Sequence, residues 1–249
     1  GTVPSLLFAA LATAQPQIID IGVPSGTNDS YVSGLSDDGL DASASCYLPG
    51  PLPLAWNANS GLRALNTFSA VYNALGISGD GKTFVGSGYS AAQNVRKPVF
   101  WSTIGGPLAW PLPPTWTGGT YYAANEDGRF LVGIFTRAGN QSIAARTDEF
   151  GTIEFIPPGQ GFANSVGATV SSDGHVVVGY WSNPTYRAFR WEEGFGSQDL
   201  GLLPGGIGAA AYGVSRDGST VVGDALLPGN VHRSFAWSAG AGISELLTA

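Results

Sequence analysis

The side chains through which this chain could do acid–base or metal chemistry are 18 carboxylates, two histidines and a single cysteine. Five of the carboxylates recur in Asp-Gly pairs, at separations of 42, 47, 46 and 44 residues. Asp-Gly between β-prone residues favours a hairpin turn, because Gly accepts positive φ and Asp can bond its own backbone. The five are Asp38, Asp80, Asp127, Asp173 and Asp217. We therefore expect these repeated carboxylates to be structural.

The remaining acids offer no catalytic pair. Glycosidases need two carboxyl groups within about 5–10 Å of each other. The segments before the five turns are expected to be the strands that line a channel, and none contains Asp or Glu. They are Tyr31–Leu35, Tyr72–Ile77, Tyr121–Asn125, Asn164–Val170 and Ala211–Val214. Asp29 is the one acidic residue expected near the channel mouth, so we predict a protein that is not an enzyme and keep a glycoside hydrolase using Asp29 as an alternative.

The sequence predicts no metal and no cofactor. His175 follows a turn and His232 lies in a loop, without further ligands at the spacing of a zinc site. No calcium-loop pattern and no Gly-x-Ser-x-Gly nucleophile motif is present. Cys46 is alone and cannot form an intramolecular disulfide, and we expect it to be a small buried apolar residue.

The composition limits the kinds of partner. The net charge is −7 and only two residues are lysine, which argues against binding a nucleic-acid backbone. Charged residues make up 12% of the chain, about half the usual share. The 37 Gly and 16 Pro recur with the repeat and indicate turns. The apolar run near the N-terminus is too short to span a membrane.

Each repeat contains four expected strands. The strand after the turn ends six residues beyond the Asp, at Gly86, Gly133, Gly179 and Gly223, with Ala44 in the first repeat. The third strand carries Trp56, Trp101, Trp191 and Trp237, with Thr147 in the third repeat. The fourth strands are expected at Leu62–Leu65, Leu108–Leu112, Ile153–Ile156, Gln198–Leu203 and Ile243–Leu247. We expect the Trp residues to be buried between neighbouring sheets.

Four short strands every ~45 residues are typical of a β-propeller blade. A small sheet cannot bury both faces alone, so neighbouring blades must stack around an axis. The prediction is an all-β, five-bladed propeller over residues 17–249, with repeats near 25–68, 69–114, 115–159, 160–204 and 205–249.

The N-terminus leaves two alternatives open. Residues 1–16 are an apolar segment that is either an extra strand or the remnant of a signal peptide. Gln17–Gly22 resembles the segment at Gln198–Leu203, and we expect it to form a strand that closes the ring beside the last repeat. Since Ile243–Leu247 also fits that position, one of the two strands is surplus, and it could pair with another molecule or belong to a longer array.

The repeat resembles a known family. Its pattern is Gly-Val-Ser-x-Asp-Gly-x-x-Val-Val-Gly, followed by a strand like Arg-Ala-Phe-Arg-Trp and by Leu-Gly-x-Leu-Pro-Gly-Gly. The best matches are Val170–Gly179, Arg187–Trp191, Asp199–Gly206, Gly213–Gly223 and Arg233–Trp237. These residues resemble the bacterial extracellular HAF-type repeat family over roughly residues 17–249. The eponymous His-Ala-Phe appears as Arg187-Ala188-Phe189, without the His. The resemblance implies a secreted or outer-surface protein, including autotransporter-passenger regions, and transfers no catalytic residue.

Aromatic residues give the candidate binding site. They fall in the variable loops or around a Pro-rich stretch, where they could stack on sugars or hold a protein partner. The candidates are Tyr89, Trp110, Trp116, Tyr121, Tyr122, Phe135, Tyr180, Trp181 and Tyr186. We expect an extracellular or cell-surface module that binds a glycan or protein. The alternative is a self-assembling surface or filament subunit that exchanges a terminal strand and forms a homo-oligomer.

Overall fold

The fold is all-β in a computed structural model of the chain. The structure describes residues 19–47, 50–67, 71–90, 95–102, 106–183 and 185–246. These residues form nineteen strands and no helix. The expected segment 1–16 and residues 17 and 18 lie outside them.

The strands form five antiparallel sheets, which we number as blades in chain order. Blade 1 contains β1 (Tyr31–Leu35), β2 (Asp41–Cys46), β3 (Leu52–Asn57) and β4 (Gly61–Ala64). Blade 2 contains β5 (Val71–Ile77), β6 (Thr83–Ser90) and β7 (Val95–Ser102). Blade 3 contains β8 (Trp116–Ala124), β9 (Phe130–Arg137), β10 (Ser142–Asp148) and β11 (Ile153–Ile156). Blade 4 contains β12 (Asn164–Val170), β13 (Val176–Ser182), β14 (Arg187–Glu192) and β15 (Gly196–Asp199), and blade 5 contains β16 (Gly208–Val214), β17 (Thr220–Leu227), β18 (Val231–Ser238) and β19 (Gly242–Glu245).

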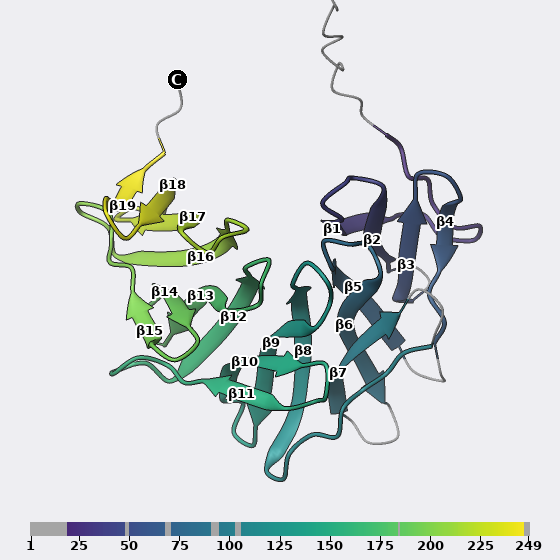
Figure 1. Cartoon of the computed structure of the whole chain (residues 1–249), viewed down its shortest axis with the longest axis horizontal. Helices are drawn as coiled ribbons and strands as arrows, with labels where there is room; N and C mark the ends of the chain where they lie inside the picture. Colours follow the sequence, from purple (N-terminus) through teal and green to yellow (C-terminus); the bar gives the residue numbers. More distant parts are fainter. Residues whose placement is uncertain are drawn as a thin grey trace, which may run out of the picture.

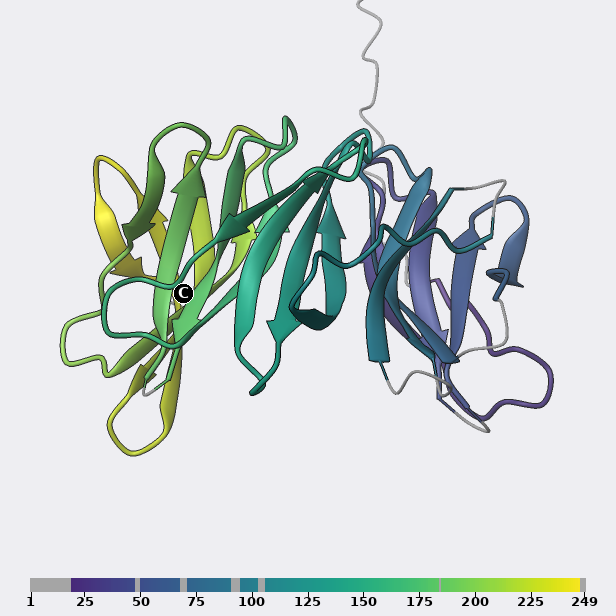
Figure 2. The same ribbon diagram turned by 90° about the horizontal axis from the view of Figure 1, so that it is seen from below.

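The blades follow one another around a common axis, as Figure 1 shows from one end and Figure 2 from the side. The first strand of each blade is innermost, and it lies beside the first strand of the next blade from β1 through β5, β8 and β12 to β16. The ribbons of blade 5 and blade 1 face each other across an opening in the arc (Figure 1). The predicted radial arrangement of five blades is therefore confirmed. The predicted closure of the ring by an N-terminal strand is not shown.

Three predicted strands differ from the structure. The fourth strand of blade 4, expected at Gln198–Leu203, is Gly196–Asp199, because the chain turns at Gly201, whose φ is +86°. Residues 19–22 form no strand, because the chain turns at Gly22, whose φ is +78°. Gly22 N–H donates to Asp20 at 2.8 Å, as Gly201 N–H does to Asp199 at 2.8 Å, so the likeness between these two segments is confirmed. In blade 2 the expected fourth strand is reduced to one bridge between Leu108 and Phe100.

The Asp-Gly turns explain why Ser or Asn precedes each Asp by two positions. In blade 2 the Ser78 hydroxyl donates to Asp80 Oδ1 at 2.7 Å and accepts the N–H of Thr83 at 2.9 Å. Asp80 Oδ1 also accepts the N–H of Lys82 at 3.0 Å. The turn glycine, Gly81, has a φ of +74°. The equivalent bonds recur in the other four turns, which are centred on Asp38, Asp127, Asp173 and Asp217.

The five hairpin tips are joined to each other near the axis. Asp37 N–H donates to the Gly79 carbonyl at 2.8 Å, and Ser172 N–H donates to the Arg216 carbonyl at 2.9 Å. Blade 3 is joined to blade 4 in the same way, because Glu126 N–H donates to the Ser172 carbonyl at 3.3 Å. The Arg216 guanidinium then reaches Asp37 at 2.7 Å and Glu126 at 2.9 Å. This side chain links blade 5 to blade 1 where no strands pair.

In blades 2 to 5 the glycine six residues after the turn Asp is required by a close backbone approach. A Cβ at Gly179 would lie 1.8 Å from the Val166 carbonyl oxygen of the neighbouring strand. Gly86, Gly133 and Gly223 face the equivalent carbonyls at 1.8, 2.0 and 2.1 Å. Only a residue without Cβ fits at these four positions, whereas blade 1 has Ala44 at the equivalent place.

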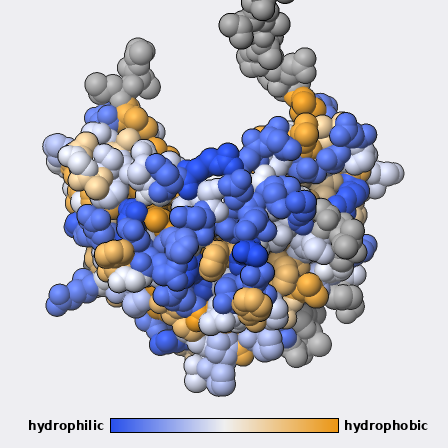
Figure 3. All heavy atoms as spheres, viewed as in Figure 1, coloured by the Kyte–Doolittle hydropathy of each residue, from blue (hydrophilic) through white to orange (hydrophobic). Residues whose placement is uncertain are grey.

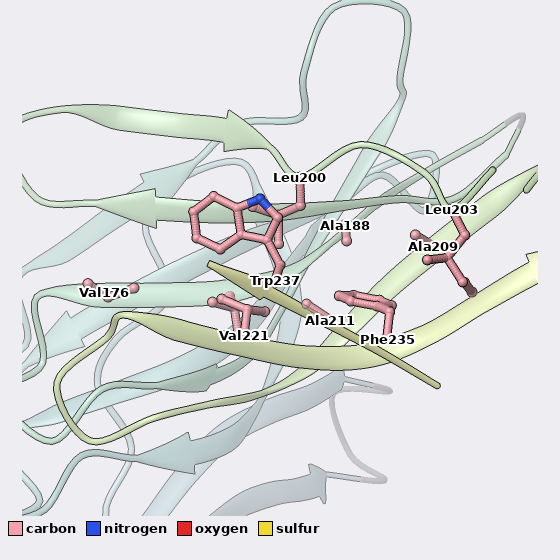
Figure 4. Packing of buried hydrophobic residues seen from close by; sticks show 11 residues of the cluster. Val176, Ala188, Leu200, Leu203, Ala209, Ala211, Val221, Phe235 and Trp237 are labelled. Atoms are coloured by element: carbon pink, nitrogen blue, oxygen red, sulfur yellow. The ribbon is translucent and has the colours of Figure 1, made fainter. Parts of the chain in front are cut away.

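The core lies between blades. Trp56, Trp101, Trp191 and Trp237 are at most 8% exposed, so their predicted burial is confirmed. Figure 4 shows Trp237 and Phe235 of blade 5 against Leu200 and Ala188 of blade 4, in a cluster that also holds Val221. In blades 2, 4 and 5 the recurring Trp therefore packs against the preceding blade.

Blade 3 fills the missing Trp position from another strand. Thr147 stands where the Trp is expected, and it is fully buried. Tyr121 of β8, also fully buried, extends across the sheet and donates its hydroxyl hydrogen to Thr147 Oγ1 at 3.0 Å. A large residue on the inner strand thus compensates for a small one on the third strand.

Candidate functional site

The innermost strands share a bulge that sets one residue apart in every blade. Strand pairing skips one residue in each, five positions before the turn Asp. The skipped residues are Ser33, Leu75, Tyr122, Ala168 and Tyr212. A bulge re-aims the side chain of the extra residue, and bulges are common next to active sites. The fold therefore holds four kinds of side chain in one repeated backbone setting near the axis.

The candidate site with three tyrosine rings is a cavity of about 190 Å³ beside the bulge of blade 5, which we call the tyrosine pocket. Its aromatic walls are Tyr180 and Tyr186 of blade 4 and Tyr212 of blade 5. Its floor is the start of β16, Gly208–Ala210, whose small residues leave the space open. Asp224 and His232 of blade 5 complete the lining.

The tyrosine rings meet edge to face. Tyr180 lies 5.6 Å from Tyr186 and 6.2 Å from Tyr212 between ring centroids, at interplanar angles of 70° and 68°. Tyr186 is 50% exposed and Tyr212 58% exposed, so a ligand can reach both. Burial raises the pKa of Tyr180, and the neighbouring Tyr212, Tyr122 and Tyr186 raise it further.

A carboxylate and an imidazole border the rings. His232 Nδ1 lies 2.6 Å from Asp224 Oδ2. Burial raises the pKa of Tyr212, and the charge of Asp224 adds to that shift. The phenol of Tyr212 therefore stays neutral at physiological pH, beside a group that carries negative charge.

The structure divides the nine predicted binding residues into four groups. Tyr122, Tyr180 and Tyr186 lie in or beside the tyrosine pocket, while Tyr89 lines a separate cavity on blade 2. Three are buried in the core: Tyr121, Phe135 and Trp181. The remaining two, Trp110 and Trp116, are half-buried and stacked on Phe100 and Phe155. The predicted set is therefore not one surface.

Sequence reasoning missed Tyr212, Asp224 and His232 as members of one site. A signal for Tyr212 was present, because it stands five residues before its turn Asp, as Tyr122 does. Asp224 and His232 are eight residues apart and meet only because β17 and β18 form a hairpin. Asp29, the acidic candidate at the channel mouth, accepts the N–H of Tyr47 at 3.1 Å, which is a structural role.

Two other cavities are bordered by charged side chains that form ion pairs with each other. At the hairpin tips, a hollow of about 200 Å³ is bordered by Asp37, Glu126 and Arg216, whose ion pairs are described above. On blade 3, a hollow of about 430 Å³ borders Arg146, which binds Glu154 at 2.8 Å and Glu193 at 3.0 Å. We interpret both as structural.

The described residues contain no group of three or more His, Cys, Asp or Glu that could hold a metal ion. Within the same residues, no helix has the length and hydrophobicity needed to cross a membrane.

Neither a protein-family model nor a curated protein matches this chain in sequence. Solved structures do match it in fold. A TolB-like protein from Agrobacterium tumefaciens has a TM-score of 0.65 at 16% identity, over 88% of this chain and 80% of that one. TolB from Acinetobacter baumannii has a TM-score of 0.60 at 16% identity, over 88% of this chain and 54% of that one.

The β-propeller domain of the Trilobed protease from Pyrococcus furiosus, described as having an open velcro topology, has a TM-score of 0.55. It is 13% identical, over 88% of this chain and 72% of that one. These matches show that the chain has the fold of β-propeller domains. At such low identity they show the fold alone, and propellers of this kind occur in enzymes and in proteins that are not enzymes.

Proposed function

We propose that this propeller is a non-enzymatic binding module that holds a glycan or protein ligand in the tyrosine pocket. The observation that carries the proposal is the convergence of Tyr180, Tyr186 and Tyr212 on one open cavity. Tyrosine rings offer flat apolar faces and a polar hydroxyl, which suits both sugars and protein side chains. The cavity is smaller than the roughly 300–1,000 Å³ of drug-sized sites, so it suits one terminal group of a larger ligand.

The resemblance to HAF-type repeats supports an extracellular or outer-surface location for this module. Closure of the ring by the N-terminal segment stays a prediction. That closure requires the segment to lie beside blade 5, in addition to the contact of Ile21 with the blade 1 residues Ala44, Cys46 and Leu54. Deletion of residues 1–26 should then accelerate hydrogen exchange at the amides of blade 5. Unchanged exchange in blade 5 would overturn this closure.

The test of the proposed function is ligand screening on a glycan array and by pull-down of surface proteins. Tyr212→Ala should abolish the binding found with the wild-type protein. Tyr31→Ala is the matched control, because Tyr31 is 56% exposed and Tyr212 is 58% exposed, and Tyr31 lies on β1, outside the pocket. Binding that survives Tyr212→Ala, or that is lost equally in both variants, would contradict the proposal.

One observation favours self-assembly as a second function. The innermost strand of blade 1 faces the opening with exposed apolar side chains: Tyr31, Val32 and Leu35 are 56%, 54% and 59% exposed. Such a strand can accept a strand from another copy. Light scattering should then show concentration-dependent oligomers that Val32→Lys disrupts, and a monomer at all concentrations would contradict this alternative.

A further inference from the structure

The tyrosine pocket has the elements of a cage for an organic cation. Three rings, Tyr180, Tyr186 and Tyr212, border the same cavity and stand at about right angles to their neighbours, with interplanar angles of 70° and 68°. The face of an aromatic ring carries partial negative charge and attracts cations. Rings set edge to face around a small cavity can present several such faces to one cation.

The carboxylate in the lining of the cavity is negative, like the partial charge on the faces of the rings. Asp224 lies in the lining, and no Lys or Arg borders the cavity. The carboxylate is close enough to Tyr212 to affect that phenol electrostatically. The two arginines that follow pocket residues in the chain, Arg187 and Arg233, are paired with Asp199 at 2.7 Å and Glu245 at 3.1 Å. The whole chain is also acidic, with a net charge of −7, which favours the approach of a cation.

The cavity has little capacity to hydrate or to pair a compact ammonium group. Asp224 already contacts His232 at 2.6 Å, so one of its carboxylate oxygens is engaged. The other walls are tyrosine rings, Leu226 and the backbone of β16. A primary ammonium, which is strongly hydrated, loses more on entering such a cavity than a methylated one.

We propose that the tyrosine pocket recognises a methylated ammonium group, with Tyr180, Tyr186 and Tyr212 as the cage and Asp224 as the counter-charge. This inference rests on the proposed function and names the chemical class of the group that enters the same site. A volume of about 190 Å³ accommodates a trimethylammonium head group, and the open side of the cavity leaves room for whatever the group is attached to.

The experiment is calorimetric titration of the full chain with tetramethylammonium, choline, phosphocholine and 3,3-dimethyl-1-butanol, with sodium chloride as the salt control. The alcohol has the shape of choline without its charge. Choline and tetramethylammonium should bind, and the alcohol should bind at least about ten-fold more weakly, because it lacks the cation–π attraction. Choline should also bind more tightly than phosphocholine, whose phosphate is repelled by Asp224.

Variants distinguish the contribution of the tyrosine rings to cation binding from the contribution of Asp224. Tyr212→Ala should weaken choline binding about ten-fold or more, while Tyr212→Phe, which keeps the ring face, should weaken it far less. Asp224→Asn should weaken both cations without changing the affinity for the alcohol, and circular dichroism verifies that this variant is folded. Tyr31→Ala should leave every affinity unchanged.

Equal affinity for choline and its neutral analogue would overturn the inference, as would cation binding that does not depend on Tyr212. If none of the four probes binds while a ligand found by screening still requires Tyr212, the methylammonium assignment fails and the proposed binding function stands. If Tyr212→Ala changes neither the screened ligand nor the probes, both fail.

Discussion

Two positions near the end of each innermost strand, the bulge and the hairpin tip that follows it, differ in how far the fold fixes their residues. At the hairpin tips, the five repeats use nearly the same residues and the same hydrogen bonds. At the bulges, five positions before the Asp, the backbone is again the same but the side chains are of four kinds: Ser33, Leu75, Tyr122, Ala168 and Tyr212.

The difference follows from what each side chain must satisfy. In the tips, Ser or Asn and Asp bond to the turn backbone, so their identity is part of the fold. In the bulges, the extra residue stands outside the strand pairing, and its side chain differs between blades. A position with constant backbone geometry and variable chemistry is suited to binding, and two of the five bulges present tyrosine to one cluster.

The largest expected effect is at the glycine six residues after the turn Asp, where the backbone geometry repeats between blades. Gly179→Ala places a Cβ 1.8 Å from the Val166 carbonyl oxygen, and the backbone rather than a side chain has to move. We expect a loss of about 3 kcal/mol or more in the free energy of unfolding, measured by urea denaturation. Gly240→Ala is the control, because its Cβ would meet nothing within 4 Å. A small loss at Gly179 would mean that the bulged backbone adapts more freely than inferred.

The backbone pattern was predictable from the sequence because it depends on local residues. The Asp-Gly turns, the glycine six positions later and the buried Trp are each visible in the repeat. The bounds of Tyr31–Leu35, Asn164–Val170 and Ile153–Ile156 agree with strands of the structure. The fourth strand of blade 2 was not predictable in this way, because Pro107 and Pro111 flank a segment that has a strand's apolar pattern but keeps only one bridge.

The site was only partly predictable, since exposure depends on packing between blades. Tyr121 and Tyr122 are neighbours in sequence and were both predicted to bind a ligand. The bulge separates them: Tyr121 turns into the core and bonds Thr147, while Tyr122 stays half-exposed. No composition or spacing in β8 distinguishes the two, because the pairing with β9 decides it.

The second prediction sharpens the contrast between these two tyrosines. Tyr121→Phe removes the hydroxyl that donates to Thr147 and leaves the buried Thr147 oxygen without that partner. We expect a loss of about 1–2 kcal/mol in the free energy of unfolding. Tyr122→Phe should change stability by less than about 0.5 kcal/mol, because its side chain is partly exposed. Equal losses in the two variants would contradict the assignment of Tyr121 to the core.

The third prediction concerns the tips and their response to acid. Hydrogen bonds from Ser215 and Ser219 lower the pKa of Asp217 from 3.8 to about 2. Because the folded pKa is depressed, the carboxylate stabilises the fold above pH about 4 and loses this contribution as the pH falls towards 2. Denaturation midpoints measured across this range should fall more for the wild type than for Asp217→Asn. Parallel curves would show that the turn does not depend on the charge.

The smallest effect is expected at the one tip residue that spans the opening. Arg216 is 63% exposed and pairs with Asp37 and Glu126 of other blades. Arg129 is the matched control, because it is 62% exposed and also meets two carboxylates, but both belong to its own blade. Exposed pairs of this kind contribute little to stability and are screened by salt. Arg216→Ala and Arg129→Ala should therefore both shift the denaturation midpoint only slightly, and the shifts should vanish at about 1 M salt.

The two variants should differ in where the fold loosens. Without the Arg216 guanidinium, nothing else among the described residues is seen to tie the tip of blade 5 to that of blade 1 by an ion pair. Hydrogen exchange at the amides of blade 1 and blade 5 should then accelerate in Arg216→Ala and stay unchanged in Arg129→Ala. Identical exchange in both variants would mean that the two end blades hold their positions through their neighbours in the arc alone. In that case the tips of blades 1 and 5 would keep their backbone geometry without the Arg216 side chain.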